Sequence, residues 1–298
     1  MARERLGSQR LREALAGYAF VAVPMAVFFL FFIFPIAYAV YISFFDWGVL
    51  GQIRGVGLDN YRELLDDEIF HKAVKNTLVY TAGVVPAQMA LGLLLAVIVN
   101  QKIRARTFFR SAFYFPSIAS SAAITAIALY IMSSNGLLNA VLGAVGLPDD
   151  TSWFGQSDTA LPSIMALNAW TTSGTMMLFY LASLQSIPEE VYEAAAIDGA
   201  GPWRTFWKIT FPLLKPGHFF VAVVSVIGAL KVFDQAFIVG GVGGEPNYST
   251  MTAVLYLYNQ AIGNVKFGYA AAVGIVLFVF IMAVTLVQRQ LFGRTEAA

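Results

Sequence analysis

The sequence contains no cysteine, only two histidines and few charged residues, and each shortage excludes a class of function. Without cysteine there is no disulfide and no thiolate metal site, and His71 and His218 alone cannot form a metal cluster. Charged residues make up 12% of the chain against 58% apolar residues, which is too little charge for the surface of a water-soluble domain. The net charge of +1 gives no reason to expect a nucleic-acid partner. The composition therefore predicts a membrane protein without a metal site.

A nucleotide-binding loop is also missing from the sequence. No G-x-x-x-x-G-K-[ST] pattern occurs, and no soluble α/β segment is long enough to hold a nucleotide. An intramembrane hydrolase would need a nucleophile and a base that face each other within the membrane, whereas both histidines fall at the edges of apolar stretches. We therefore expect no catalytic residues and no cofactor in this chain.

Long apolar stretches are what the sequence does contain. Each is about 20 residues or longer and can cross a hydrocarbon core of roughly 30 Å as a helix. The six stretches are residues 18–44, 76–99, 112–132, 161–184, 217–239 and 267–288. No repeat, low-complexity linker or second soluble domain interrupts them. The sequence predicts an all-α membrane protein with six transmembrane helices, forming a single transmembrane domain over residues 1–298.

Basic residues indicate the orientation, because Lys and Arg near the ends of spans stay on the cytoplasmic side. With the N-terminus inside, most of them fall on inside segments: Arg3, Arg5, Arg10, Arg12, Lys102, Arg104, Arg106, Arg110, Arg204, Lys208, Lys215, Arg289 and Arg294. The outside segments carry only Arg54, Arg62, Lys72, Lys75 and Lys266. We expect a multi-pass protein of a bacterial or archaeal plasma membrane with both termini in the cytoplasm.

Two connections are long enough to have structure of their own. The external segment 133–160 has apolar residues at helical spacing from Leu137 to Val145, which predicts a short helix on the outer face. The internal segment 185–216 encodes two short helices. Pro188 suits a first helical turn, and Gly199 supplies the left-handed residue that ends a helix. The second helix begins at Pro202 and should end at Pro212 and Pro216, just before the fifth span.

The first of these helices contains the run Ala194-Ala195-Ala196. Small side chains let the backbone of another protein approach closely, so this helix is suited to docking. An amphipathic turn that lies on the membrane surface explains the same pattern, and the residues alone leave both interpretations open.

The internal segment also resembles the EAA loop of ABC importer permeases. The matching residues are Glu193, Ala194, Ala195, Asp198, Gly199, Ala200, Phe206, Ile209, Pro212 and Pro216. In that family the loop holds a coupling helix that sits in a groove on the ATP-hydrolysing subunit. The resemblance implies a type I ABC importer permease fold. It also implies that the contact is made by Glu193, Ala194, Ala195, Asp198, Gly199 and Ala200.

A second resemblance, to carbohydrate permeases of the maltose type, follows the fifth span. Its residues are Phe233, Asp234, Gly240, Gly241, Gly244, Pro246, Ser249, Thr250, Tyr256 and Tyr258, although the glycine stretch is irregular. This resemblance implies a second homologous permease, two ATP-binding subunits that bind ATP and Mg²⁺, an extracellular or periplasmic solute-binding protein, and a di- or oligosaccharide as cargo. Glycerol phosphate or another polar solute is an alternative cargo. An ion-coupled secondary transporter is a further alternative, although the inverted repeats typical of that class are not detected.

A sugar pathway needs hydrogen-bonding groups for hydroxyls and aromatic rings for C–H faces. The candidates within the spans are Asn168, Trp170, Thr171, Phe233, Asp234 and Gln235. Lys231 and Asp234 are ionisable residues within a predicted span, and at a spacing of three they can pair on one helix face or contact the solute. Gln88, next to Pro86, is a weaker candidate. For any single aromatic residue here, helix packing is the simpler interpretation.

Overall fold

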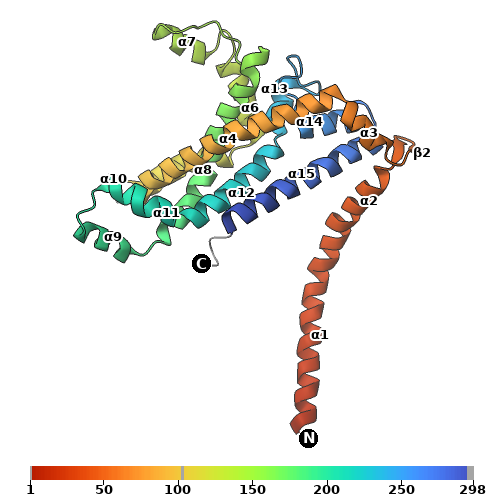
Figure 1. Cartoon of the computed structure of the whole chain (residues 1–298), viewed down its shortest axis with the longest axis horizontal. Helices are drawn as coiled ribbons and strands as arrows, with labels where there is room; N and C mark the ends of the chain where they lie inside the picture. Colours follow the sequence, from red (N-terminus) through yellow and green to blue (C-terminus); the bar gives the residue numbers. More distant parts are fainter. Residues whose placement is uncertain (1, 102–103, 294–298) are drawn as a thin grey trace. The chain divides into compact units, whose positions relative to one another are not determined.

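The structure is a computed structural model that describes residues 2–101 and 104–293, with side chains described for residues 13–101 and 104–290. Lys102 and Arg294, which the topology prediction used, lie outside these residues. The described chain is mostly helical, with one two-stranded sheet (Figure 1). Its internal contacts divide it into two units. One comprises the chain up to Leu64 together with Gln260–Ile275, and the other comprises Leu65–Asn259 and the chain from Val276 onward.

The first unit consists of a long N-terminal helix followed by a hairpin. Its elements are α1 (Ala2–Phe28), η1 (Phe29–Ile33), α2 (Phe34–Ile42), β1 (Phe45–Gly48), β2 (Gly51–Gly55), most of α3 (Asp59–Asp66), most of η3 (Asn259–Gly263) and the start of α15 (Phe267–Gly293). The most apolar part of Glu13–Ile42 has no residue buried inside the structure. An apolar helix with every face exposed is suited to lipid and not to water.

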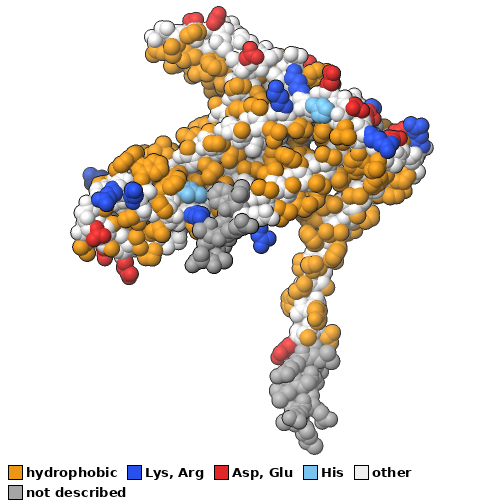
Figure 2. Space-filling view, viewed as in Figure 1, with side chains coloured by type: hydrophobic (Ala, Val, Ile, Leu, Met, Phe, Trp, Pro, Cys, Tyr) orange, Lys and Arg blue, Asp and Glu red, His pale blue; other side chains and the backbone are white. Residues whose placement is uncertain are grey.

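The second unit is a helical bundle with short helices at its ends. Its elements are α4 (Glu68–Asn100), α5 (Arg106–Ile118), α6 (Ser121–Ile131), α7 (Leu137–Ala144), α8 (Ser157–Gln185), α9 (Glu189–Ile197), α10 (Pro202–Thr205), η2 (Phe206–Thr210), α11 (Phe211–Leu213), α12 (Lys215–Leu230), α13 (Asp234–Gly240), α14 (Ala253–Tyr258) and the rest of α15. Helix α7 confirms the short helix predicted in segment 133–160. Over the middle of α4 the visible surface is mainly hydrophobic, while basic side chains gather toward the start of this helix (Figure 2).

Helices α4, α8 and α12 pack against one another and form the core of this unit. The core contains fully buried side chains from all three helices, among them Tyr80, Ile164, Met177 and Val221. Gly92 lets α4 approach α8 closely, since a Cβ at this position would lie 2.5 Å from the Cβ of Met176. The packing of α4 on α8 therefore depends on a missing side chain.

We expect Gly92→Ala to destabilise the protein by about 1–3 kcal/mol, because the added methyl group overpacks the α4–α8 contact. Gly228→Ala in α12 is the matched control, since no atom lies within 4 Å of its Cβ position. The unfolding temperature of the purified transporter in detergent should fall for Gly92→Ala and stay unchanged for Gly228→Ala. Equal unfolding temperatures for the two variants would contradict the packing described here.

The candidate membrane spans differ in number from the six predicted. Within the described residues, four helices are long and apolar enough to cross a membrane: Glu13–Ile42, Glu68–Asn100, Lys215–Gly240 and Phe267–Gln290. The predicted span 112–132 is instead the pair α5 and α6, bent by 91°, and counting it as one broken span gives five. The bend arises because Ala119 and Ser120 leave the helical conformation.

The predicted span 161–184 lies within α8, which has 29 residues and is long enough to cross the membrane. Polar residues such as Asn168, Thr172 and Ser173 make this helix less apolar than the four candidates. A membrane crossing by α8 therefore stays a prediction, as does the single domain over residues 1–298.

Candidate functional site

Helix α9 forms the first part of the internal segment, as the sequence predicted. Pro188 precedes it in an extended conformation, and Glu189 and Glu190 occupy its first turn, where carboxylates favour the positive end of the helix dipole. At its other end Gly199 has φ +71°, a conformation that glycine adopts without strain. The Ala200 N–H donates to the Ala195 carbonyl (2.9 Å) and the Gly199 N–H donates to the Ala196 carbonyl (3.1 Å). These two bonds complete a Schellman cap that fixes the end of α9.

The exposed surface of α9 carries most of the predicted coupling residues. Glu193, Ala194, Asp198 and Gly199 are exposed, whereas Ala195 is buried and Ala200 is half-buried. Ile197 on the same helix is 87% exposed. A helix of small residues with a carboxylate and an exposed isoleucine can dock into a groove of another protein. That these residues contact an ATPase stays a prediction.

The second helix of the segment begins at Pro202, as predicted, and runs through α10, η2 and α11. The prediction that Pro212 ends this helix is wrong, because Pro212 occupies the first turn of α11. The interruption lies at Leu214 (φ −75°, ψ 4°), and α12 follows with Pro216 in its first turn. The Thr210 hydroxyl donates to the Tyr192 hydroxyl at 3.4 Å, a contact that links η2 to α9.

A cavity of about 260 Å³ separates the two helices of the segment. Its lining residues are Ala195, Asp198, Ala200, Arg204, Lys208 and Ile209. Arg204, Lys208 and Asp198 bring charges of both signs to this cavity. In Figure 2, charged side chains gather at this end of the unit, over α9 and α10.

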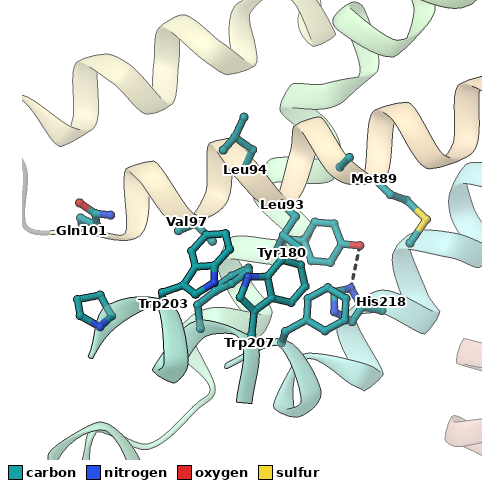
Figure 3. Close-up of a pocket in the computed structure, with 13 residues that line it drawn as sticks. Met89, Leu93, Leu94, Val97, Gln101, Tyr180, Trp203, Trp207 and His218 are labelled. Carbon is teal, nitrogen blue, oxygen red and sulfur yellow. Dashed lines mark hydrogen bonds between the residues drawn. The ribbon is translucent and has the colours of Figure 1, made fainter. Parts of the chain in front are cut away.

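A larger groove of about 880 Å³ lies between α4 and the helices from α10 to the start of α12. Figure 3 shows Leu94 and Val97 of α4 on one side and Trp203 and Trp207 on the other. Its main polar feature is the Tyr180 hydroxyl, which lies 3.0 Å from the His218 Nδ1 atom. From the sequence, His218 was expected only at the edge of a span, and this groove was not predicted. The aromatic spacing Trp203, Phe206, Trp207 and Phe211 was its one available signal.

A separate cavity of about 300 Å³, more polar than this groove, brings together most of the predicted pathway residues. It is lined by Gln88, Ser121, Asn168, Thr172, Met176, Val224, Ser225, Gly228, Ala229, Lys231, Val232, Phe233, Asp234 and Gln235. Two hydrogen bonds organise its polar side. The Asn168 amide donates to Gln235 Oε1 at 2.9 Å, and the Thr172 hydroxyl donates to Gln88 Oε1 at 2.7 Å. Such a cavity offers amides, hydroxyls and an aromatic ring to a polar solute.

Lys231 and Asp234 both line this cavity but do not share one helix face. Helix α12 ends at Leu230, and α13 begins at Asp234, after Phe233 with the non-helical angles φ −139° and ψ −61°. The predicted span 217–239 lies within the candidate membrane span Lys215–Gly240, but its helix is interrupted at residues 231–233. Among the described side chains no ion pair joins Lys231 to Asp234. The break leaves both charged groups exposed to the cavity.

Two of the predicted pathway residues lie outside this cavity. Trp170 is 53% exposed on α8, and Thr171 is buried with its hydroxyl donating to the Asn168 carbonyl at 3.1 Å. Conversely, Thr172 lines the cavity although it was not among the predicted pathway residues, and so does Gln88, which was only a weaker candidate. Their hydrogen bond joins residues 84 positions apart, a separation that helical periodicity cannot reveal.

The glycine-rich loop that follows α13 is held by hydrogen bonds to α4. Lys72 Nζ donates to the Asn247 carbonyl at 2.7 Å, and the Asn76 amide donates to the carbonyls of Tyr248 and Met251 at 2.8 and 2.9 Å. A side chain at Gly240 would collide with the Thr250 hydroxyl. Part of the second resemblance, from Gly241 to Thr250, therefore lies in one ordered loop between α13 and α14.

Comparison with known proteins assigns these features to a family. Residues 88–296 match the family described as binding-protein-dependent transport system inner membrane component. The chain belongs to this family. It is thus a multi-pass inner-membrane subunit of a binding-protein-dependent ABC transporter and not itself an enzyme. Such a transporter works with a solute-binding protein. The predicted family and the mostly helical membrane fold are confirmed.

Several relatives align over nearly the whole chain. The multiple sugar-binding transport system permease protein MsmF of Streptococcus mutans is 35% identical over 282 residues, covering 94% of this chain and 96% of the relative. The arabinooligosaccharides transport system permease protein AraP of Bacillus subtilis is 34% identical (93% and 88% covered), and the lactose transport system permease protein LacF of Rhizobium radiobacter is 32% identical (91% and 92%).

The fold is also that of a solved transporter subunit. A chain of the bacterial alginate ABC transporter, in a crystal structure with an alginate pentasaccharide-bound periplasmic protein, superposes with a TM-score of 0.82 at 23% identity and covers 95% of both chains. At this identity the likeness shows a shared fold.

Proposed function

We propose that this family member forms half of the pathway through which a carbohydrate, a di- or oligosaccharide, enters the cell. The supporting observation is the cavity of about 300 Å³, in which Asn168, Gln235 and Thr172 surround a space that Phe233 also lines. Amides and hydroxyls can bind sugar hydroxyls, while an aromatic face packs on C–H groups. Relatives named for sugar, lactose and arabinooligosaccharide transport support the same class of cargo.

Transport would proceed by alternating access driven by a partner ATPase. Helix α9 is the transmission element in this proposal, because its cap fixes its end and its exposed face carries Glu193 and Ala194. Closure of two ATP-binding subunits, which bind ATP and Mg²⁺, would push this segment. A second homologous permease would complete the pathway around a central cavity. Both termini would lie in the cytoplasm, with α8 as a further crossing.

Lys231 favours a second cargo, since an ammonium group in the cavity suits an anionic solute such as glycerol phosphate. Asp234 lines the same cavity and would repel that solute, so the neutral sugar remains the main proposal. An ion-coupled transporter that works alone does not fit membership of a binding-protein-dependent family.

The test uses the complete transporter in proteoliposomes with its solute-binding protein and ATP. The solutes are labelled neutral monosaccharides, disaccharides, trisaccharides and glycerol phosphate. We expect ATP-dependent uptake of a di- or trisaccharide that exceeds uptake of the other solutes. Uptake of glycerol phosphate alone would contradict the proposed cargo, and uptake without ATP would contradict the proposed energy source.

A further inference from the structure

The β1–β2 hairpin begins almost directly at the end of the N-terminal apolar helix. Only Ser43 and Phe44 separate α2 from β1. The Asn60 amide donates to the carbonyls of Ser43 (2.7 Å) and Phe45 (3.1 Å), and the Ser43 hydroxyl lies 2.6 Å from the Tyr61 hydroxyl. The root of the hairpin is therefore fixed to the end of α2 and to α3.

The same hairpin packs on the start of a second apolar helix, α15, within the first unit. A side chain at Gly268 would collide with the Phe45 carbonyl, and a Cβ at Gly48 would lie 3.9 Å from the Val265 carbonyl. Both Glu13–Ile42 and Phe267–Gln290 are long and apolar enough to cross a membrane. A hairpin held where one such helix ends and another begins lies at the surface of the bilayer.

The tip of the hairpin is apolar and makes little contact with the protein. Val49 is 75% exposed, Leu50 is 100% exposed, and Ile53 on β2 is 66% exposed. The charged residues lie toward the root, where Asp46 is opposite Arg54 in the register of the two strands. A hairpin that projected into water would be expected to carry its charge at the tip and its apolar residues at the root. The observed order is the reverse.

Aromatic rings mark the same boundary. Tyr38 and Tyr41 on α2 lie within 6.3 Å of the Trp47 ring, and Tyr41 lies 4.7 Å from the Phe45 ring, all measured between centroids. Tyr and Trp are enriched where hydrocarbon meets headgroups, because their rings are apolar and carry one polar atom. This cluster places the last turns of α2 and the root of the hairpin at headgroup level.

We propose that the β1–β2 hairpin lies along the bilayer surface and inserts Val49 and Leu50 at the boundary between headgroups and acyl chains. The hairpin then anchors the end of the first span to lipid. Its occupant is phospholipid and not another protein, because the exposed tip continues the exposed apolar surface of the helix it follows.

The absence of cysteine makes this inference directly testable, because one substitution gives this chain a single labelling site. Leu50→Cys would carry an environment-sensitive fluorophore on the complete transporter in lipid nanodiscs. Arg54→Cys on the same hairpin is the matched control, since it is exposed at the charged root. Lipids with a nitroxide at the top of the acyl chain provide the quencher.

We expect blue-shifted emission and several-fold stronger lipid quenching for the label at Leu50 than for the label at Arg54. Equal, water-like emission with equal quenching at both sites would overturn the proposal. Shielding of the Leu50 label only after addition of the solute-binding protein, without lipid quenching, would also overturn it and assign the tip to a protein contact. Because Leu50 is fully exposed, its substitution should leave folding unchanged; Val49→Cys provides a second test of the same tip.

Discussion

Replacing Gly199 by valine is expected to lower solute uptake about tenfold or more while ATP hydrolysis by the complex continues. Gly199 ends α9 at φ +71°, where a β-branched residue carries strain of about 1–3 kcal/mol. Relief of that strain would open the Schellman cap and displace α9 from the docking position proposed for it. Uptake and ATP hydrolysis by the same proteoliposomes provide the measurement, with the amount of permease in the membrane checked in parallel.

Gly201→Val is the matched control in the same segment. Neither Gly199 nor Gly201 has an atom within 4 Å of its Cβ position, but Gly201 has the ordinary angle φ −69°. Gly201→Val should therefore retain uptake, and Gly199→Asn should restore much of it, because asparagine tolerates the left-handed conformation. Equal loss in both valine variants would show that bulk, and not backbone conformation, causes the effect.

Glu193→Gln gives an independent test of the same segment, because it removes an exposed charge without changing the backbone. We expect reduced uptake at an unchanged level of permease in the membrane. Unchanged uptake in both Glu193→Gln and Gly199→Val would remove the assignment of this loop as the coupling element.

Replacing Asn168 by leucine is expected to lower uptake about tenfold, since it removes an amide from the cavity and leaves buried Gln235 without its partner, a loss of about 1–3 kcal/mol. The single variant should also unfold at a lower temperature. Concentration-dependent uptake and thermal unfolding of the purified complex measure the two effects separately.

The double variant Asn168→Leu with Gln235→Leu separates solute binding from structure. When both partners become apolar, the penalty for an unpaired polar group disappears, so stability should recover. Uptake should stay low, because the cavity has lost both amides. Recovery of uptake together with stability would show that the pair only holds α8 to α13 and does not contact the solute.

Local signals in the sequence were sufficient for the internal segment. Pro188, Gly199 and Pro202 each constrain the backbone by themselves, so the ends of α9 and the start of α10 could be predicted without any long-range contact. The mostly helical membrane fold was predicted for a related reason, since the length of an apolar stretch is a local property.

Features that depend on distant contacts or on single dihedral angles could not be predicted in this way. The break between α12 and α13 falls at residues 231–233, inside the stretch Lys215–Gly240 whose length and composition suit a continuous span. The pairing of Asn168 with Gln235 joins residues 67 positions apart. The hairpin had a local signal, because Gly48 and Gly51 flank a two-residue turn. This signal covers only a few residues and directly follows a long apolar stretch, which dominates the pattern of this part of the sequence.

The central claim is that α9 is held by an ATP-hydrolysing partner, and cross-linking from this helix tests it most directly. Ala196→Cys places a unique, exposed thiol on α9 for a photoreactive label, and irradiation of the complete transporter is followed by identification of the attached chain. We predict a cross-link to the ATP-binding subunit whose yield changes with nucleotide. Cross-links to lipid alone, or none to the ATP-binding subunit in any nucleotide state, would contradict the claim.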